Sequence, residues 1–186
     1  MDKKILYSLK VGITLAFIFI CLEVGAQDRY VSEKSLITFF SDGVVEDILS
    51  KNQKVTSLFD AEKSEIAFLL NVKDFQFQKK TMQVHFNEKY METHKFPKAT
   101  FQGIVKGYNK NEVGAQQVKA YGKLFIHGVT RDVIIDGKLE FQDGKVILKS
   151  TFLIALADYN IKIPQIIWQN VSQHIEVQMH LVYRSF

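Results

Sequence analysis

Apolar and polar residues alternate along most of this chain. Near the C-terminus, apolar side chains occupy every second position from Ile175 to Tyr183, and the positions between them are mostly polar. Residues 118–126 repeat the pattern in the middle of the chain. Because successive side chains of a strand point to opposite faces of its sheet, a period of two predicts strands with one buried face.

Further strands follow from the same reasoning. We expect them at residues 35–41, 44–51, 54–59, 65–72, 100–105, 131–135 and 146–154. Glycine weakens a strand interior, so Gly137 is expected to separate the strand at 131–135 from another short strand that ends at Phe141. The sequence "QDGK" at residues 142–145 is typical of a tight hairpin.

One segment interrupts this rhythm. In "KKTMQVHFNEKYMET", residues 79–93, Met82, Phe86 and Tyr90 recur every four positions, and His85 adds a position to the same stripe. This spacing predicts a helix with one apolar face. The stretch that follows, "HKFPKATFQG", contains Pro97, which disfavours helical geometry at the residue before it. We therefore interpret this stretch as a corner between the helix and the next strand.

The number and spacing of the strands predict an all-β fold. Eight to ten short strands with one helix, placed after the fourth or fifth strand, are typical of a closed antiparallel barrel of about eight strands. Such a barrel has an interior that is either filled by side chains or just wide enough for one ligand. The sequence has neither internal repeats nor low-complexity stretches, so we expect one domain.

The first 26 residues have the layout of a secretory signal peptide. Three lysines precede an apolar run at residues 11–20, and small residues at 24–26 offer a cleavage site. The apolar run is short for a membrane span. We expect residues 1–26 to be removed and residues 27–186 to form the domain, which would then reside in the periplasm. A retained membrane anchor is one alternative. A lipid attached to Cys21 is a less favoured one, because Ile20 stands where a lipoprotein signal has a small residue.

Composition and missing motifs argue against several functions. Residues 27–186 contain 21 basic and 18 acidic residues, which are scattered rather than gathered in one stripe, so we expect no binding of nucleic acid. The one cysteine, Cys21, lies in the segment expected to be removed, which excludes thiol catalysis and zinc ligation by cysteine. The histidines lack metal-ligand spacing, and the common catalytic motifs are missing. We expect no enzyme activity, metal or cofactor.

Four segments, in order between residues 79 and 164, resemble the YceI-like family of exported, lipocalin-like bacterial barrels. They are the helical "KKTMQVHFNEKY", the corner "KFPKATFQG", the strand and turn "YGKLFIHGVTRDVIID", and the late loop "LADYNIKIP". Two positions depart from the family pattern. Lys80-Thr81-Met82 replaces a common arginine-aspartate pair, and Asn160 stands where many members have glycine, although asparagine also tolerates positive φ.

The resemblance implies a barrel whose apolar lumen holds a long isoprenoid chain, such as a polyprenyl lipid or a quinone tail. Each buried methylene contributes roughly 0.8 kcal/mol. A long tail therefore needs only a dry tunnel with a few polar atoms at its mouth. A carrier or sequestering role would involve transient contact with a membrane, and a homodimer is compatible with it.

The candidate ligand-binding residues are those expected to line the lumen, the helix or the late loop. On the strands they are Leu36, Phe40, Ile66, Phe68, Leu70, Phe101, Leu124, Ile126, Phe152, Val177 and Met179; on the helix and late loop they are Met82, His85, Phe86, Tyr90 and Tyr159. Each of them could instead be ordinary core. His85 could bind a ligand headgroup or a backbone carbonyl of the barrel rim.

Two other functions stay open. The barrel could be filled by its own side chains and act in the cell envelope through contacts with other proteins. It could also be an outer-membrane barrel, although several strands are shorter than the roughly nine to eleven residues that spanning requires. A close-packed lumen would remove the basis for a carrier.

Overall fold

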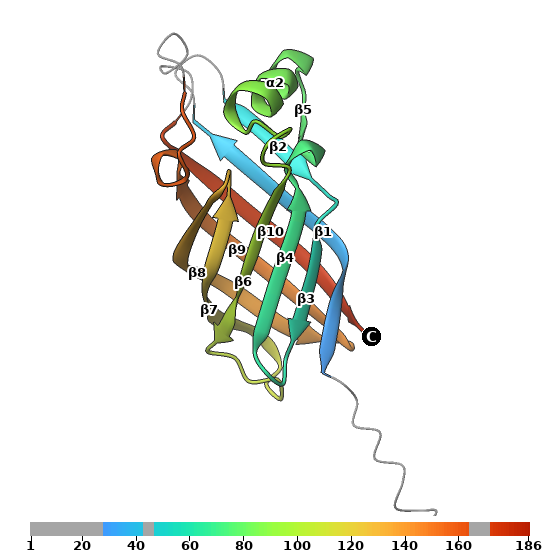
Figure 1. Ribbon diagram of the computed structural model, residues 1–186. Helices are drawn as coiled ribbons and strands as arrows, with labels where there is room; N and C mark the ends of the chain where they lie inside the picture. Colours follow the sequence, from blue (N-terminus) through green and yellow to red (C-terminus); the bar gives the residue numbers. More distant parts are fainter. Residues whose placement is uncertain (1–27, 43–46, 164–171) are drawn as a thin grey trace, which may run out of the picture.

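The computed structural model describes residues 28–42, 47–163 and 172–186. The expected signal peptide at 1–26 and part of the strand expected at 44–51 lie outside these residues. Among the described residues, eight strands close into an antiparallel barrel, as Figure 1 shows. They are β1 (Arg29–Ser41), β3 (Thr56–Asp60), β4 (Glu65–Asn71), β6 (Lys98–Lys106), β7 (Gly114–Ile126), β8 (Val129–Gln142), β9 (Lys145–Ala155) and β10 (His174–Ser185). The predicted all-β barrel is therefore confirmed.

The barrel closes through β1. This strand pairs with β10 along most of its length, from Tyr30 to Phe40, and its first residues pair with β3 on the other side. The second half of β1 pairs instead with β2 (Ile48–Asn52), and β2 pairs with the two-residue strand β5 (Gln76–Phe77). The fully buried Asn52 stabilises the gap between β2 and β3, because its side chain accepts a hydrogen bond from the Lys54 N–H and donates one to the Asn71 carbonyl.

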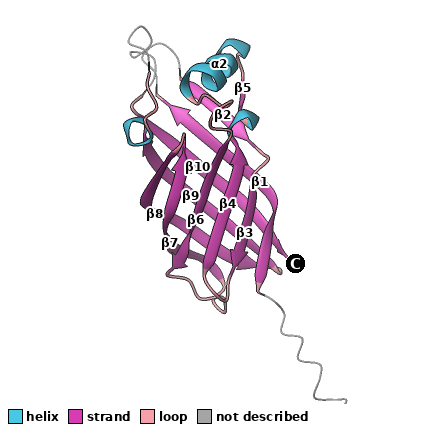
Figure 2. Cartoon of the chain, viewed as in Figure 1, coloured by secondary structure: helices cyan, strands magenta, loops and turns pink. Residues whose placement is uncertain are grey.

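A short helical segment lies over one end of the barrel (Figure 2). It consists of α2 (Lys80–His85) and a π-helical turn, η3 (Phe86–Tyr90). The Gln83 side chain fixes its position, since Nε2 donates to the Phe75 carbonyl at 2.7 Å and Oε1 accepts from the Phe77 N–H at 3.2 Å. The helix expected at residues 79–93 is confirmed, but it ends three residues earlier than expected.

The segment after the helix is a corner, as predicted. β6 begins at Lys98, and the Phe96 ring packs edge-on against the His127 ring, with the ring centroids 4.4 Å apart. The hairpin at "QDGK" is also confirmed, because Asp143 and Gly144 both have positive φ, the conformation required by a two-residue turn between strands.

The prediction that Gly137 separates two strands is wrong. β8 is continuous, and Gly137 pairs with Val118 of β7 on one side and with Ser150 of β9 on the other. A paired strand on each side holds the glycine backbone extended, which outweighs the weak strand propensity of glycine.

The two ends of the barrel are packed differently. We call the end under α2 the helical end and the opposite one the closed end. At the closed end five large side chains are 0–1% exposed and enclosed by their neighbours; these are Phe59, Leu139, Val146, Leu181 and Tyr183. Side chains therefore fill the lumen around these residues, and the apolar cavity of the lumen lies at the helical end.

Candidate functional site

An apolar cavity of about 360 Å³ occupies the helical end of the lumen. Its walls are the inner faces of strands on both sides of the barrel, and the helical segment contributes Met82, Phe86 and Tyr90. The volume lies within the usual range for small-molecule sites, roughly 300–1,000 Å³. The cavity is the candidate binding site.

Nine of the sixteen predicted residues line this cavity. They are Leu70, Met82, His85, Phe86, Tyr90, Ile126, Phe152, Val177 and Met179. They come from β4, the helical segment, β7, β9 and β10. The structure thus brings them to one site, and their contact with a ligand stays a prediction.

The predicted role of Leu36 and Phe40 as lumen residues is wrong. On β1 it is Ile37 and Phe39 that line the cavity, opposite Met179 and Val177 of β10. Leu36 and Phe40 alternate with them and therefore point to the other face of the strand. Both faces of this strand carry large apolar residues, so alternation alone did not identify the inner one.

Five further predicted residues lie outside the cavity lining. Ile66, Phe68, Phe101 and Leu124 belong to or pack against the barrel core, but they are deeper than the cavity. Tyr159 is 3% exposed and lies in the late loop, where burial raises the pKa of its hydroxyl. The four strand residues face the barrel interior as expected, but they and Tyr159 are not among the residues that line the cavity, and their contact with a ligand stays a prediction.

The cavity has an aromatic wall that was not predicted from the sequence. Phe39, Phe75 and Phe77 surround Phe86, with ring centroids 4.9–5.9 Å from the Phe86 ring. Such spacing is typical of favourable aromatic packing. Phe75 and Phe77 lie beside or within the two-residue strand β5, which is too short to show an alternating pattern. Three of the four phenylalanines in this wall, Phe39, Phe75 and Phe77, lie outside the helix, and their accumulation was the available signal.

Few polar groups reach the cavity. Of the described lining residues, only Ser41, His85 and Tyr90 carry a side-chain nitrogen or oxygen. Ser41 Oγ already accepts a hydrogen bond from the Ser172 N–H at 2.9 Å. Burial raises the pKa of the Tyr90 hydroxyl, which therefore stays neutral and can donate or accept a hydrogen bond. The site suits a mostly apolar molecule with at most one small polar group.

His127 connects three segments of the rim at the helical end. Its Nδ1 lies 3.1 Å from the Tyr159 carbonyl, and its Nε2 lies 3.3 Å from a Glu92 carboxylate oxygen. A carbonyl only accepts hydrogen bonds, so Nδ1 carries a proton. Hydrogen bonding from Lys95, together with His127, lowers the pKa of Glu92. The turn between β7 and β8 is thereby held against both the corner and the late loop.

The described residues show neither metal ligation nor a membrane-spanning helix. In residues 28–42, 47–163 and 172–186, no three histidine, cysteine, aspartate or glutamate side chains come together as a metal site would require. Within the same ranges no helix has the length and apolar character needed to cross a bilayer.

Solved structures with the same fold were found. A polyisoprenoid-binding domain from Saccharophagus degradans has a TM-score of 0.73 at 14% identity, with 84% of this chain and 98% of that one covered. BcnA from Burkholderia cenocepacia has a TM-score of 0.69 at 17% identity, covering 80% of this chain and 95% of that one. A YceI protein from Campylobacter jejuni has a TM-score of 0.51 at 17% identity, with coverages of 70% and 83%.

Sequence comparison gave one result at the family level. No match was found among the sequences of curated proteins. In contrast, the family model described as a YceI-like domain matches residues 31–183, which span the barrel from β1 to β10. The chain therefore belongs to the YceI-like family.

Proposed function

We propose that this protein binds an isoprenoid lipid in the cavity at the helical end and acts as an exported carrier or sequestering protein in the periplasm. The observation that carries the proposal is the cavity itself: a space of about 360 Å³ with almost no side-chain polar atoms in its lining. A water molecule in such a space lacks hydrogen-bond partners, which favours displacement by an apolar chain.

The energetics support binding without catalysis. A methylene group occupies about 30 Å³, the same as a water molecule in the liquid. The cavity therefore has room for about twelve methylene groups. At roughly 0.8 kcal/mol each, their burial contributes about 10 kcal/mol. Association costs about 4–15 kcal/mol, so a net favourable affinity requires a well-filled cavity rather than a loosely occupied one.

Two comparisons support an isoprenoid as the ligand. The chain belongs to the YceI-like family, and the domain from Saccharophagus degradans with the same fold is described as polyisoprenoid-binding. Branched chains such as isoprenoids also suit a lining built from large aliphatic and aromatic side chains. The signal-like layout of residues 1–26 supports export to the periplasm.

The test is to identify what the purified protein contains. Protein isolated under mild conditions is extracted with organic solvent, and the extract is analysed by mass spectrometry. We expect an isoprenoid lipid in the wild type and little of it in Ala99→Phe, because Ala99 lines the cavity and a phenyl ring would fill it. Folded protein without any extractable lipid, and without uptake of added prenyl alcohols, would refute the proposal.

Ala67→Phe is the matched control. Ala67 lies on β4 between Ile66 and Phe68, and it faces the outside of the barrel opposite Gln102. The same substitution there adds the same volume without entering the cavity. We expect Ala67→Phe to retain lipid as the wild type does, and circular dichroism should show both variants folded.

A further inference from the structure

We propose that the cavity accepts only a short isoprenoid chain, of about two to four units, and that Phe101 is the residue that sets this limit. This inference rests on the proposed function and adds the ligand class to it. It follows from the position at which the open part of the lumen ends, because a chain cannot extend into the closed end without displacing side chains.

On one wall, the cavity ends within β10. Ile175, Val177 and Met179 line it at successive inward positions, but the next two inward residues do not. Leu181 and Tyr183 are 0% and 1% exposed, so their side chains are enclosed on all sides. The floor on this side lies directly below Met179.

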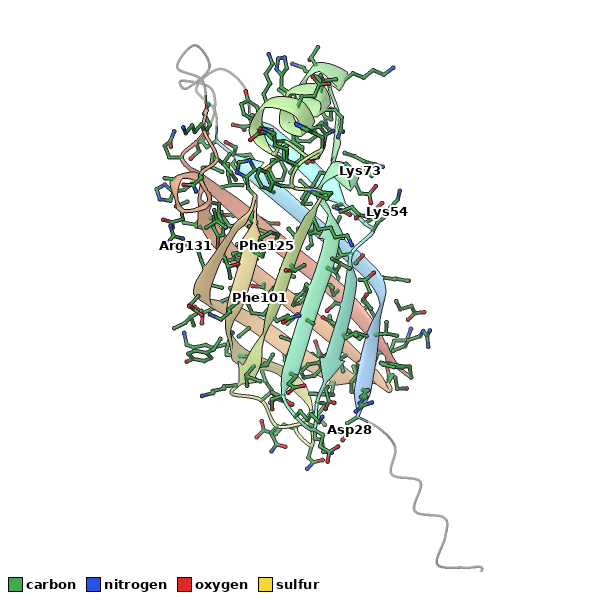
Figure 3. All side chains as sticks on the ribbon, in the orientation of Figure 1. Asp28, Lys54, Lys73, Phe101, Phe125 and Arg131 are labelled. Carbon is green, nitrogen blue, oxygen red and sulfur yellow. The ribbon has the colours of Figure 1, made fainter. Side chains whose placement is uncertain are left out.

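On the opposite wall, the first inward side chain below the cavity lining is Phe101. Ala99 of β6 lines the cavity, and Phe101, the next inward residue of the same strand, is 5% exposed and lies below it. Figure 3 shows Phe101 about midway along the barrel. Its ring lies over the paired glycines Gly103 and Gly122: a Cβ added at either position would come within 2.8 Å of the ring carbon Cζ. The two glycines thus leave the space that the Phe101 ring fills.

Below this floor, aromatic rings occupy the closed end. Tyr30, Phe59, Tyr108 and Phe141 form a circuit in which each ring packs against the next, with centroids 5.6–6.2 Å apart. Tyr183 packs against Phe59 from within the barrel, at 6.5 Å. A chain that passed Phe101 would meet this second obstruction.

Two estimates give the length that fits. Four residues separate Ile175 from Met179, which is about 13 Å along a strand. The three backbone bonds between successive Cα atoms span about 3.8 Å. An extended isoprene unit has four backbone bonds, so by the same scale it spans about 5 Å. The depth therefore accommodates two to three units, and the volume, with room for about twelve carbon atoms, holds two five-carbon units and part of a third. The remaining carbons of a chain of three or four units would extend past Met82 and Tyr90 and out of the mouth of the cavity.

The experiment is a competition between chain lengths. Protein stripped of lipid is incubated with vesicles that contain farnesol, geranylgeraniol and solanesol, with three, four and nine isoprene units, at equal mole fraction. The protein is then separated from the vesicles, and mass spectrometry measures the ratio of bound short alcohols to bound solanesol. We expect the wild type to favour the short alcohols by about tenfold or more.

The variants test the role of Phe101. In Phe101→Ala the space over the two glycines opens to the cavity, and the ratio should move toward solanesol by several-fold. Phe101→Leu should move it in the same direction by less, and this variant keeps the test valid if the alanine variant does not fold. Phe125→Ala is the matched control, since Phe125 lies between Leu124 and Ile126 on the outer face of β7 and is labelled beside Phe101 in Figure 3.

The outcomes separate the two proposals. If the wild type binds solanesol as well as it binds farnesol, the length limit is wrong, while the proposed function stands. If the ratio is unchanged in both folded Phe101 variants, the assignment to Phe101 is wrong. If the wild type takes up none of the three alcohols, the proposed function itself fails.

Discussion

The Ser57 Oγ lies 2.8 Å from the Tyr183 hydroxyl in the closed end of the barrel, and both residues are 1% exposed. Ser57 Oγ also donates to the Ala67 carbonyl at 2.8 Å. Because a hydroxyl has one hydrogen, Ser57 must accept from Tyr183, and the direction of the hydrogen bond is fixed. This bond joins β10 to β3 across the interior and satisfies the polar groups of a region that is otherwise apolar.

Removing this bond should destabilise the barrel. We expect Tyr183→Phe to lower the free energy of unfolding by about 1 kcal/mol, since the phenyl ring still packs but the hydrogen bond is lost. Urea unfolding at neutral pH measures the difference. Tyr121→Phe is the control: Tyr121 is on the outer face and 39% exposed, so removing its hydroxyl should have little effect. Equal stability of Tyr183→Phe and the wild type would show that the bond contributes nothing.

The same tyrosine should make stability depend on alkaline pH. Complete burial raises the pKa of Tyr183 well above its ordinary value of 10.0. The unfolded chain ionises this tyrosine above that value, whereas the folded chain holds it neutral, so the stabilisation present below pH 10 decreases as the pH rises. Between about pH 9 and pH 11, the unfolding free energy should fall less steeply in Tyr183→Phe than in the wild type. Parallel slopes would contradict this.

Glu92 should make the free energy of unfolding depend on pH in the acidic range. Its pKa lies below the ordinary 4.5, mainly because Lys95 hydrogen-bonds to it and also because His127 is near. The stabilisation is present above pH 4.5 and is lost as the pH falls through the lowered folded-state value. Unfolding measured from neutral pH to below pH 4 should therefore show a weaker acid dependence in Glu92→Gln. Glu88→Gln, an exposed change in the adjacent π-helical turn, should keep the wild-type dependence.

Close approach of β6 and β7 should make Gly122 intolerant of a side chain. A Cβ at this position would lie 2.2 Å from the Gln102 carbonyl oxygen, a backbone atom that cannot move aside locally. We expect Gly122→Ala to lower the unfolding free energy by about 1–3 kcal/mol or more. In Gly137→Ala the nearest atom would be at 3.1 Å, so thermal unfolding should show a smaller loss there. A larger loss at Gly137 would contradict the geometric reasoning.

His85 should recognise the polar end of a ligand. It is one of three described lining residues with a polar side-chain atom, and a hydrogen bond to a hydroxyl contributes about 1 kcal/mol. His85→Leu should weaken binding of farnesol several-fold but leave the affinity for farnesene, a hydrocarbon of equal length without the hydroxyl, nearly unchanged. Titration of the stripped protein with each compound provides the measurement. An equal loss for both compounds would assign His85 to packing.

The architecture could be predicted from the sequence because several of the strands that build it alternate over many residues. Residues 175–183 of β10 and 118–126 of β7 show a period of two, and the helix has a separate four-residue repeat. Local pattern and tertiary structure agree in these elements. Gly137 is the exception, since pairing with Val118 and Ser150 on neighbouring strands decides its conformation and no local pattern reports such pairing.

The site could be predicted only in part. Leu70, Ile126 and Val177 were found because each lies on an alternating strand. On β1 both faces are apolar, and only pairing with β10 reveals that Ile37 and Phe39 point inward. Nor does alternation report depth along the barrel axis. It placed Phe101 correctly on the inner face, but it could not say that the ring lies below the cavity rather than beside it.

The solid packing of the closed end has a consequence for how the protein would work over many rounds of loading and release. Its five most enclosed side chains hold β3, β8, β9 and β10 together without help from any guest molecule. The barrel should therefore stay folded when its cavity is empty. The proposed carrier role requires this, because a carrier spends part of each cycle without a bound lipid.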